Sequence, residues 1–383
     1  KLRELYKLPQ HPIKVVEPMQ LLGEVEPDLL EKTGADVVPL WNRSTLMGTS
    51  NRLTKRWDMG DGTPVLMSDN FEYDVNDKGD TLVYPCGDRS APYSMMMPKN
   101  GYFFDNIYRS PPVDEDNLSP IEDYKDNYTL ASEEDCKHWE LTSRQLFENT
   151  GFAIMGVKGG MGLGDIAEIP GPFLAHPKGI RDIAGWLMAH LTTPEYIEAI
   201  FNYETEIALK NLELYRQAVG NRIQVIWLSG TDFGTQTSLM QSKEIFRALY
   251  KPFYKKVNDW VHKNTTWKTF YHTCGACEPL IEDFIDMGMD ILNPVQTSAA
   301  GMDPAHLKKT YGDRIVFWGG GVDTQKTLPT GTPDQVRKQV LERLEIFSPR
   351  GGFVFATVHN VLACVPAENV AAMYDAIKEF RGL

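Results

Sequence analysis

The sequence lacks the features that mark membrane, secreted and nucleic-acid-binding proteins. None of its 383 residues form a run approaching the roughly 20 apolar residues of a membrane span, and the N-terminus lacks the apolar core of a signal peptide. It has 39 Lys+Arg against 52 Asp+Glu and no long basic run, which argues against a nucleic-acid partner. Five cysteines, an odd number, argue against a secreted disulfide framework. We therefore expect a cytoplasmic protein with no membrane or nucleic-acid partner.

Regular alternation of short and long apolar patterns is what the chain does have. Six β-branched or aromatic runs are typical of buried strands, at 152–157, 223–230, 269–274, 290–296, 315–321 and 352–358. Helix-length amphipathic segments separate or follow them, at about 180–218, 242–262, 278–287, 303–310, 332–346 and 366–381. This order predicts a parallel sheet. With 35–41 as a first strand and one more before residue 150, it predicts a (β/α)8 TIM barrel, with a doubly wound sheet as the alternative.

The region from about 57 to 130 has a different pattern. Gly, Asp, Asn and Pro interrupt short apolar runs, which indicates hairpins and loops. We interpret it as an N-terminal insertion that caps the barrel, within a single barrel domain over 1–383. The acidic stretch 111–128 is predicted to be a solvated loop.

Candidate site residues lie at the predicted strand ends, where parallel barrels carry their active sites. Polar, aromatic and sulfur side chains follow five of the strands: Asp232, Phe233 and Gln236; His272, Cys274 and Cys277; Asn293 and Gln296; Asp323 and Gln325; His359, Asn360 and Cys364. The sequence therefore predicts one site built from several loops.

His272 and Cys274 are the strongest pair among them. Side chains two apart at a strand end project to the same side, and a thiolate with an imidazole suits zinc. His359 ends another strand, and Cys277 and Cys364 lie nearby in sequence, so a site of three or four ligands is the expectation. The alternatives are a buried histidine and thiols without metal, or a redox C-x-x-C pair at Cys274 and Cys277 that lacks a thioredoxin-like context.

Asp232 and Asp323 are the candidate carboxylates. Each suits a hydrogen bond to a substrate hydroxyl or a proton transfer, and each could instead cap the following helix. The glycine-rich stretches at 159–165 and 319–321 have neither the dinucleotide nor the Walker A spacing. We therefore expect no nucleotide site.

Several of these segments resemble a known family. HTCG at 272–275, DILNPVQ at 290–296 and the segments at 307–340 and 351–380 are similar to the C-terminal half of the uroporphyrinogen decarboxylase superfamily. The resemblance is closest over 223–383 and looser over 1–150. It implies a (β/α)8 barrel, and either a tetrapyrrole decarboxylase or a corrinoid-dependent methyltransferase, a group that includes anaerobic O-demethylases.

Two departures bear on the branch. The decarboxylases carry an Arg-Gln-Ala-Gly-Arg-Tyr segment that this chain lacks, which favours the methyltransferase branch. In that branch the resemblance implies zinc held by His-x-Cys, matched by His272 and Cys274, and by a further Cys at the last strand. Here that position holds His359, as in the decarboxylases. We take His359 as the third ligand, with Cys364, Cys277 or an absent metal as alternatives.

The resemblance then implies an O-demethylase component. A methyl group would pass from a small methylated donor, an aromatic methyl ether by preference, to the cob(I)alamin of a separate corrinoid protein, because this chain has no Asp-x-His-x-x-Gly cobalamin signature. Zinc would act as Lewis acid, and Asp232, Asp323 and His359 would be catalytic. The expected substrate-binding residues are Met161, Trp227, Phe233, Gln236, Asn293, Gln296, Trp318, Gln325 and Asn360.

Three further possibilities stay open from the sequence. The enzyme alternative is a cofactor-free decarboxylase of a tetrapyrrole, with His359 stabilising charge and Asp232 donating a proton. The non-enzyme alternative is a barrel that binds a tetrapyrrole or corrinoid without turning it over. Barrels of this superfamily often pair, so a homodimer is a candidate assembly.

Overall fold

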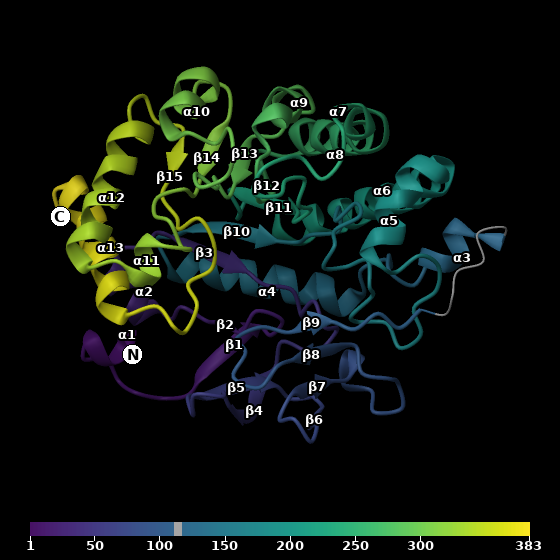
Figure 1. Ribbon diagram of the computed structural model, residues 1–383, viewed down its shortest axis with the longest axis horizontal. Coiled ribbons are helices and arrows are strands. Elements are labelled where there is room, and N and C mark those ends of the chain that lie inside the picture. Colours follow the sequence, from purple (N-terminus) through teal and green to yellow (C-terminus); the bar gives the residue numbers. More distant parts are fainter. Residues whose placement is uncertain (111–116) are drawn as a thin grey trace.

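The computed structural model describes residues 1–110 and 117–383. Its centre is a curled parallel sheet in the order β15-β14-β13-β12-β11-β10-β3 (Figure 1). The strands are β3 (Val37–Leu40), β10 (Ala153–Val157), β11 (Val225–Ser229), β12 (Lys268–His272), β13 (Ile291–Asn293), β14 (Val316–Trp318) and β15 (Phe353–Val354). Each neighbouring pair is parallel. The predicted barrel-like α/β fold is confirmed.

The structure differs from the prediction in one respect, because the expected eighth strand is not part of the described seven-stranded sheet. All seven strands assigned from the sequence form, but the described residues add no eighth strand to this sheet. The chain between β3 and β10 instead pairs mostly with itself in antiparallel hairpins. β3 and β15 are therefore the two edges of the sheet.

Helices follow the strands and cover the outer face of the sheet (Figure 1). They are α4 (Glu133–Asn149), α5 (Ile183–Thr192), α6 (Pro194–Val219), α7 (Lys243–Ile245), η3 (Phe246–Tyr250), α8 (Lys251–Asn264), η4 (Glu278–Leu280), α9 (Ile281–Asp286), α10 (Pro304–Tyr311), α11 (Thr327–Thr330), α12 (Pro333–Phe347) and α13 (Ala367–Arg381). Ser132 and Thr332 start α4 and α12 with capping boxes. The segment predicted at 180–218 is two helices, since Pro194 starts a new helix after Thr193.

The N-terminal third forms two smaller sheets beside the wall. Their elements are α1 (Leu2–Leu5), β1 (Ile13–Glu17), β2 (Leu22–Gly23), α2 (Pro27–Thr33), β4 (Leu53–Asp58), β5 (Pro64–Ser68), β6 (Tyr73–Val75), β7 (Thr81–Val83), η1 (Pro85–Gly87), β8 (Met95–Met97) and β9 (Asp105–Asn106). The sheet orders are β2-β1-β5-β4 and β6-β7-β8-β9. Buried side chains such as Trp57, Phe71 and Phe104 give this part a core of its own.

The acidic stretch 111–128 differs in part from its prediction. Residues 111–116 lie outside the described residues. Residues Pro120–Tyr124 form the helix α3 rather than a loop, and the Tyr124 side chain is fully buried. Its ring lies 5.6 Å from that of Trp186, so the apolar content of this segment overrides its acidic character.

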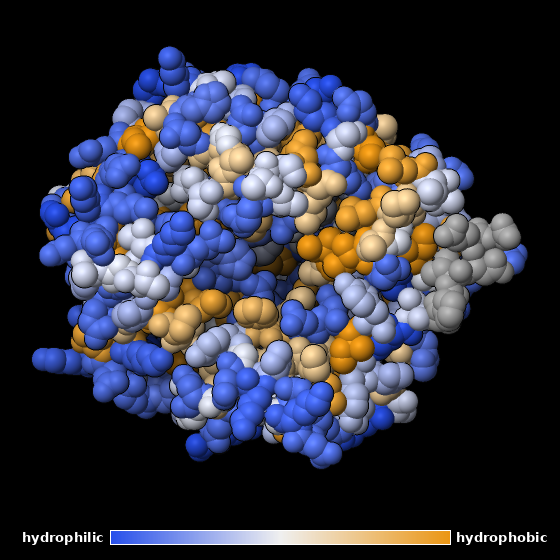
Figure 2. Space-filling view, in the orientation of Figure 1, coloured by the Kyte–Doolittle hydropathy of each residue, from blue (hydrophilic) through white to orange (hydrophobic). Residues whose placement is uncertain are grey.

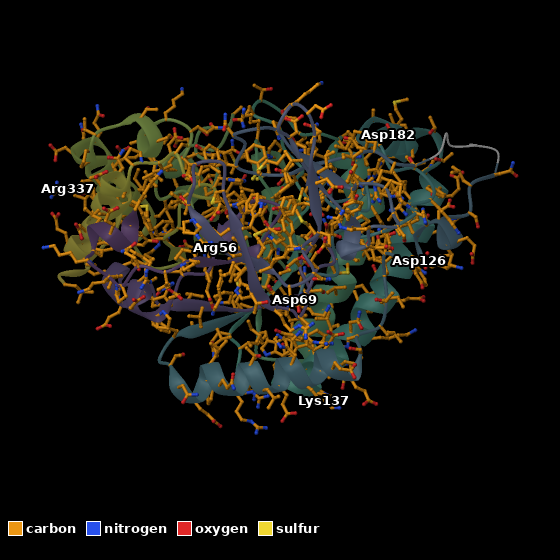
Figure 3. The ribbon with its side chains drawn as sticks, turned by 90° about the horizontal axis from the view of Figure 1, so that it is seen from below. Arg56, Asp69, Asp126, Lys137, Asp182 and Arg337 are labelled. Atoms are coloured by element: carbon orange, nitrogen blue, oxygen red, sulfur yellow. The ribbon has the colours of Figure 1, made fainter. Side chains whose placement is uncertain are left out.

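Alternation along the strands decides which side chains face the inside of the curled sheet. Phe317 on β14 packs outward, with its ring 5.6 Å from that of Phe347 on α12. The flanking position, Trp318, faces inward and lies 5.3 Å from Phe270. Lys137 on the outer face of α4 and Arg337 on α12 are charged side chains that point away from the sheet (Figure 3). No helix among the described residues is long and apolar enough to cross a bilayer.

Candidate active site at the strand ends

The loops after β11 and β12 bring a carboxylate, an imidazole and a thiol together. Nε2 of His272 lies 3.4 Å from Sγ of Cys274 and 3.9 Å from Oδ1 of Asp232. The Cys274 amide donates to Oδ1 of Asp232 at 2.5 Å. One ligand atom from each residue lies within 4.8 Å of the other two. In the described part of the chain, no other three or more His, Cys, Asp or Glu side chains meet so closely.

Asn293 orients the imidazole of His272. The Nδ2 group of Asn293, on β13, donates to the Trp318 carbonyl at 2.8 Å, so its Oδ1 must face His272 Nδ1, also at 2.8 Å. Because an amide oxygen only accepts, Nδ1 of His272 carries the hydrogen. The lone pair of His272 is then on Nε2, which points toward Cys274 and Asp232.

The loops themselves are locked together by amide contacts. Oε1 of Gln296 accepts from the Gly275 amide at 2.8 Å, and its Nε2 donates to Gln236 at 2.9 Å. Gly275 has a φ of 89°, and a Cβ atom there would overlap the backbone of Gly234. Glycine is therefore required at 275 for the close approach of the two loops. Gln236 and Gln296, predicted to bind substrate, bind each other here.

Burial and neighbouring charges shift the pKa values of Cys274 and His359 in opposite directions. Burial, and then the carboxylate of Asp232, raise the pKa of Cys274 well above its ordinary value. The ring of His359 lies 6.5 Å from that of His272. His359 keeps solvent contact, yet the protein atoms around its ring, and then His272, lower its pKa.

The remaining predicted sulfur ligands, Cys277 and Cys364, are not part of this group of three residues. Cys277 is fully buried, with Sγ 4.0 Å from Sδ of Met302, and burial raises its pKa to about 12. Cys364 is an exposed free thiol. Asp232, predicted as a catalytic carboxylate and not as a ligand, is the residue that the structure brings against His272 and Cys274.

Aromatic rings line the inside of the sheet below these residues. The Trp227 ring lies 6.3 Å from the imidazole of His272 and 5.8 Å from Phe270, which in turn contacts Trp318. Figure 2 shows a hollow near the centre of the molecular surface in this view, at the place where Figure 1 shows β10 and β11. The site thus combines an apolar wall with a polar rim.

Two of the predicted substrate-binding residues, Met161 and Phe233, do not join the aromatic rings inside the sheet. Met161 is fully buried in the main core. The ring of Phe233 packs outward against helix side chains, at 5.0 Å from Phe246 and 5.1 Å from Tyr250. Because Met161 and Phe233 follow strand ends in the sequence, they were expected near the site. The sequence does not indicate which way their side chains point.

The C-terminal predicted residues serve local structure. The carboxylate of Asp323 accepts from the amides of Gln325 at 2.7 Å and Lys326 at 3.2 Å, in the loop before α11. It does not cap that helix, whose N-cap is Lys326 with no side-chain cap. Oε1 of Gln325 accepts from Ser298 at 3.3 Å. Asn360 donates to Gln20, which ties the last loop to the N-terminal part.

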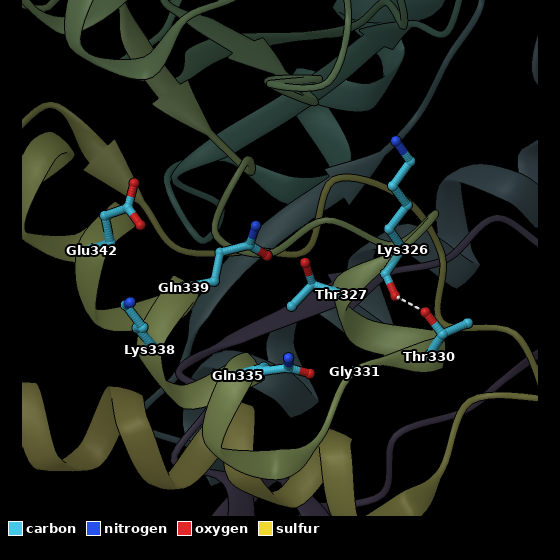
Figure 4. Close-up of a pocket in the computed structure, with 8 residues that line it drawn as sticks. All are labelled: Lys326, Thr327, Thr330, Gly331, Gln335, Lys338, Gln339 and Glu342. Atoms are coloured by element: carbon cyan, nitrogen blue, oxygen red, sulfur yellow. Dashed lines mark hydrogen bonds between the residues drawn. The ribbon is translucent and has the colours of Figure 1, made fainter.

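A cavity of about 490 Å³ lies between α11 and α12 (Figure 4). It is lined by Lys326, Thr327, Thr330, Gly331, Gln335, Lys338, Gln339 and Glu342. None of these is a predicted site residue. Gln339 links the cavity to the loop after β14, since its Oε1 accepts from the Asp323 amide at 2.9 Å.

Three acidic residues near the strand ends are not among the site residues predicted from the sequence. Asp165 and Glu168 lie in the loop after β10, and Glu204 lies on α6. The glycine-rich stretch 159–165 lacks nucleotide-binding spacing, and that comparison does not reveal the acid at its end. Its place directly after a strand, with an acid at its end, was the signal that could have pointed to them.

Comparison with known proteins places this site in a family. The family model for uroporphyrinogen decarboxylase (URO-D) matches residues 171–380. A solved structure, a methyltransferase from Methanosarcina mazei, is similar over 99% of this chain and 97% of its own, with a TM-score of 0.54 and 16% identity, which shows a shared fold. No curated protein matches. Because the family model spans more than half of the chain, this protein belongs to the uroporphyrinogen decarboxylase family.

Proposed function

We propose that this protein is a zinc-assisted methyltransferase that moves a methyl group from a small methylated donor to the reduced corrinoid of a separate protein. The observation that carries the proposal is the group formed by Asp232, His272 and Cys274, with the His272 lone pair directed into it. The fold shared with a methyltransferase supports this branch of the family. The acidic balance of the chain, 52 Asp+Glu against 39 Lys+Arg, does not suit a substrate rich in carboxylates, which disfavours the decarboxylase alternative.

The donor set fits zinc. A thiol, an imidazole nitrogen and a carboxylate oxygen are the three ligand types that zinc takes in proteins. No ion pair in the described residues joins Asp232 to a lysine or arginine. A cation would therefore offset the burial and the negative charge of Asp232, which together raise the pKa of Cys274, and would favour its thiolate.

Each residue has a distinct part in the proposed chemistry. His272 and Cys274 would hold the metal, with Asp232 or His359 completing the set. When bound, zinc supplies a Lewis acid that stabilises negative charge on a leaving oxygen. Trp227 and Phe270 would orient an aromatic methyl ether, the donor we favour, against this group. Whichever of Asp232 and His359 is not a ligand is placed to hold a proton for the leaving oxygen.

Metal content decides the zinc assignment. Wild-type protein prepared without chelators should hold about one zinc per chain by mass spectrometry, and His272→Ala and Cys274→Ala should lose it. Cys136→Ala, on α4 and away from the site, is the matched control. Comparison of Asp232→Asn with His359→Ala identifies the third ligand. A wild-type protein without zinc contradicts the assignment.

Methyl transfer is tested separately. The protein is mixed with a reduced corrinoid protein and a set of methyl ethers, and methylation of the corrinoid is followed by absorbance. Transfer that is lost in Cys274→Ala supports the proposed function. Conversion of a porphyrinogen instead, with no methyl transfer, supports the decarboxylase alternative.

A further inference from the structure

The cavity between α11 and α12 lies outside the metal group and beside the loop after β14. Its volume of about 490 Å³ falls in the range of roughly 300–1,000 Å³ that is typical of small-molecule pockets. Gln339 connects it to that loop through the Asp323 amide. In parallel barrels, the loops after the last two strands frequently take part in binding phosphate groups. The cavity adjoins the first of these two loops.

Two glutamines of α12 have only their donor ends free in this cavity. Oε1 of Gln335 accepts from the Thr332 amide at 2.8 Å in the capping box, and Oε1 of Gln339 accepts from the Asp323 amide at 2.9 Å. Because a backbone amide only donates, the oxygen of each side chain must face it. The Nε2 group of each glutamine bonds to no described residue. Both side chains therefore offer hydrogens to a ligand and no acceptor.

The charge of the lining is positive. Lys326 and Lys338 stand on opposite sides of the cavity (Figure 4), and neither forms an ion pair with a described residue. Glu342 is the one acid among the eight lining residues, and its Oε1 already pairs with Arg343 at 3.1 Å. Two lysines against one paired glutamate leave an excess of positive charge, in a chain whose net charge is −13.

These donors reach the cavity from two walls. Gln335, Lys338 and Gln339 lie three and four residues apart, so they share one face of α12. Lys326 and Thr327 lie opposite them, at the start of α11. The Thr327 hydroxyl, which can also donate, has no hydrogen-bond partner among the described residues. A ligand in between would meet hydrogen-bond donors on both sides.

We propose that this cavity binds the phosphate group of a small molecule, held by the amide hydrogens of Gln335 and Gln339 and by the ammonium groups of Lys326 and Lys338. A tetrahedral phosphate has oxygens for both walls at once, whereas a carboxylate has two oxygens in one plane. Charge-assisted hydrogen bonds from lysine to phosphate are among the strong ones. This second site goes beyond the proposed function, since none of its residues belongs to the metal group.

The chemistry of the phosphate group is shared by the free ion and by phosphate esters. The cavity is large enough to hold an ester with a small polar body, because its lining is made of amide, hydroxyl and charged side chains. Elsewhere the acidic chain repels anions, so anion binding to this protein should report on this cavity.

Calorimetry on the full-length protein tests the proposal, at constant ionic strength and without zinc or corrinoid. The probes are inorganic phosphate, glycerol 3-phosphate, glycerol and acetate. We expect both phosphates to bind with a Kd below about 1 mM, and acetate at least about 10-fold more weakly. Tighter binding of glycerol 3-phosphate than of the free ion would identify an ester as the ligand, and equal binding would identify the phosphate group alone.

Three results overturn the proposal. They are no saturable binding of either phosphate below about 10 mM, binding of acetate as tight as that of phosphate, and binding of glycerol as tight as that of its phosphate ester.

Variants locate the bound phosphate. Gln335→Glu keeps the acceptor for the Thr332 amide, since glutamate serves equally in a capping box, but it replaces the free NH2 group with a charged oxygen. We expect it to lower phosphate affinity by at least about 10-fold. Gln145→Glu, an exposed position on α4, makes the same change of charge and should stay within about 2-fold of wild type.

Lys338→Gln supplies a second test that leaves the capping box intact. It removes one cation and should lower affinity by about 3- to 10-fold, with Lys137→Gln on α4 as its control. Phosphate binding that is unchanged in both Gln335→Glu and Lys338→Gln overturns the assignment to this cavity. If Gln335→Glu does not fold, Lys338→Gln decides alone.

Discussion

Oδ1 of Asn293 accepts the Nδ1 hydrogen of His272 at 2.8 Å, and the Trp318 carbonyl holds the amide in that orientation. Asn293 is thus a positioning residue, although the sequence indicated a substrate contact. This bond selects the tautomer with its lone pair on Nε2, the form needed for a metal ligand.

Replacing Asn293 should weaken metal binding without removing a ligand. We expect Asn293→Ala to lower zinc affinity by about 10- to 100-fold, because the imidazole loses its fixed tautomer and orientation. Competition with a colorimetric chelator measures this. Asn293→Asp keeps an acceptor and should retain most of the affinity; equal losses in the two variants would contradict the role in positioning.

Gly275→Ala should destabilise the fold strongly. The new Cβ would overlap the Gly234 backbone at a φ of 89°, so we expect a loss of about 3 kcal/mol or more in urea denaturation. Gly351→Ala separates the two causes, because Gly351 has a φ of 73° and nothing within 4 Å of the new atom. It should cost only about 1 kcal/mol. Similar losses at both positions would rule out the clash.

Glu204 should make the protein less stable as pH rises. Burial, and then Glu168, raise its pKa well above the unfolded value, so the folded state keeps a proton that the unfolded state releases. Its contribution is fully present below the unfolded pKa near 4.5 and falls as pH rises toward the folded pKa, by at most about 1.4 kcal/mol per pH unit.

The variant Glu204→Gln should remove that dependence. Urea denaturation between pH 5 and 8 should show a smaller decline in unfolding free energy than wild type. Glu206→Gln, an exposed acid on the same helix, is the control and should follow wild type. An unchanged slope in Glu204→Gln would show that Glu204 is ionised in the folded state.

Cys274 should be a slow nucleophile until Asp232 is neutralised. The Asp232 carboxylate helps raise the pKa of the thiol, so Asp232→Asn should speed alkylation of Cys274 in metal-free protein at pH 8. Mass spectrometry of iodoacetamide-treated protein follows the modified residue. Cys277, which is fully buried, should stay unmodified in both proteins. No increase at Cys274 would contradict the electrostatic coupling.

Most strands of the parallel sheet could be predicted, because each depends on the spacing of apolar residues within a short segment. Runs such as 223–230 and 315–321 are apolar on both faces, and the amphipathic segments after them start with proline or an acidic first turn. The eighth strand could not be predicted, because the region 57–130 contains several strand-like segments that pair in other sheets. Whether such segments join the wall or pair together depends on contacts distant in sequence.

Sequence alone determined the parallel order of strands and the pairing of His272 with Cys274, because both follow from spacing along one chain. Only the tertiary structure decided that Asp232 joins them, that Asn293 orients the imidazole, and that Phe233 packs away from the hollow. It also brought Glu168 and Asp165 near Glu204. These relations depend on side-chain direction and on packing between separate loops, which spacing along the sequence does not encode.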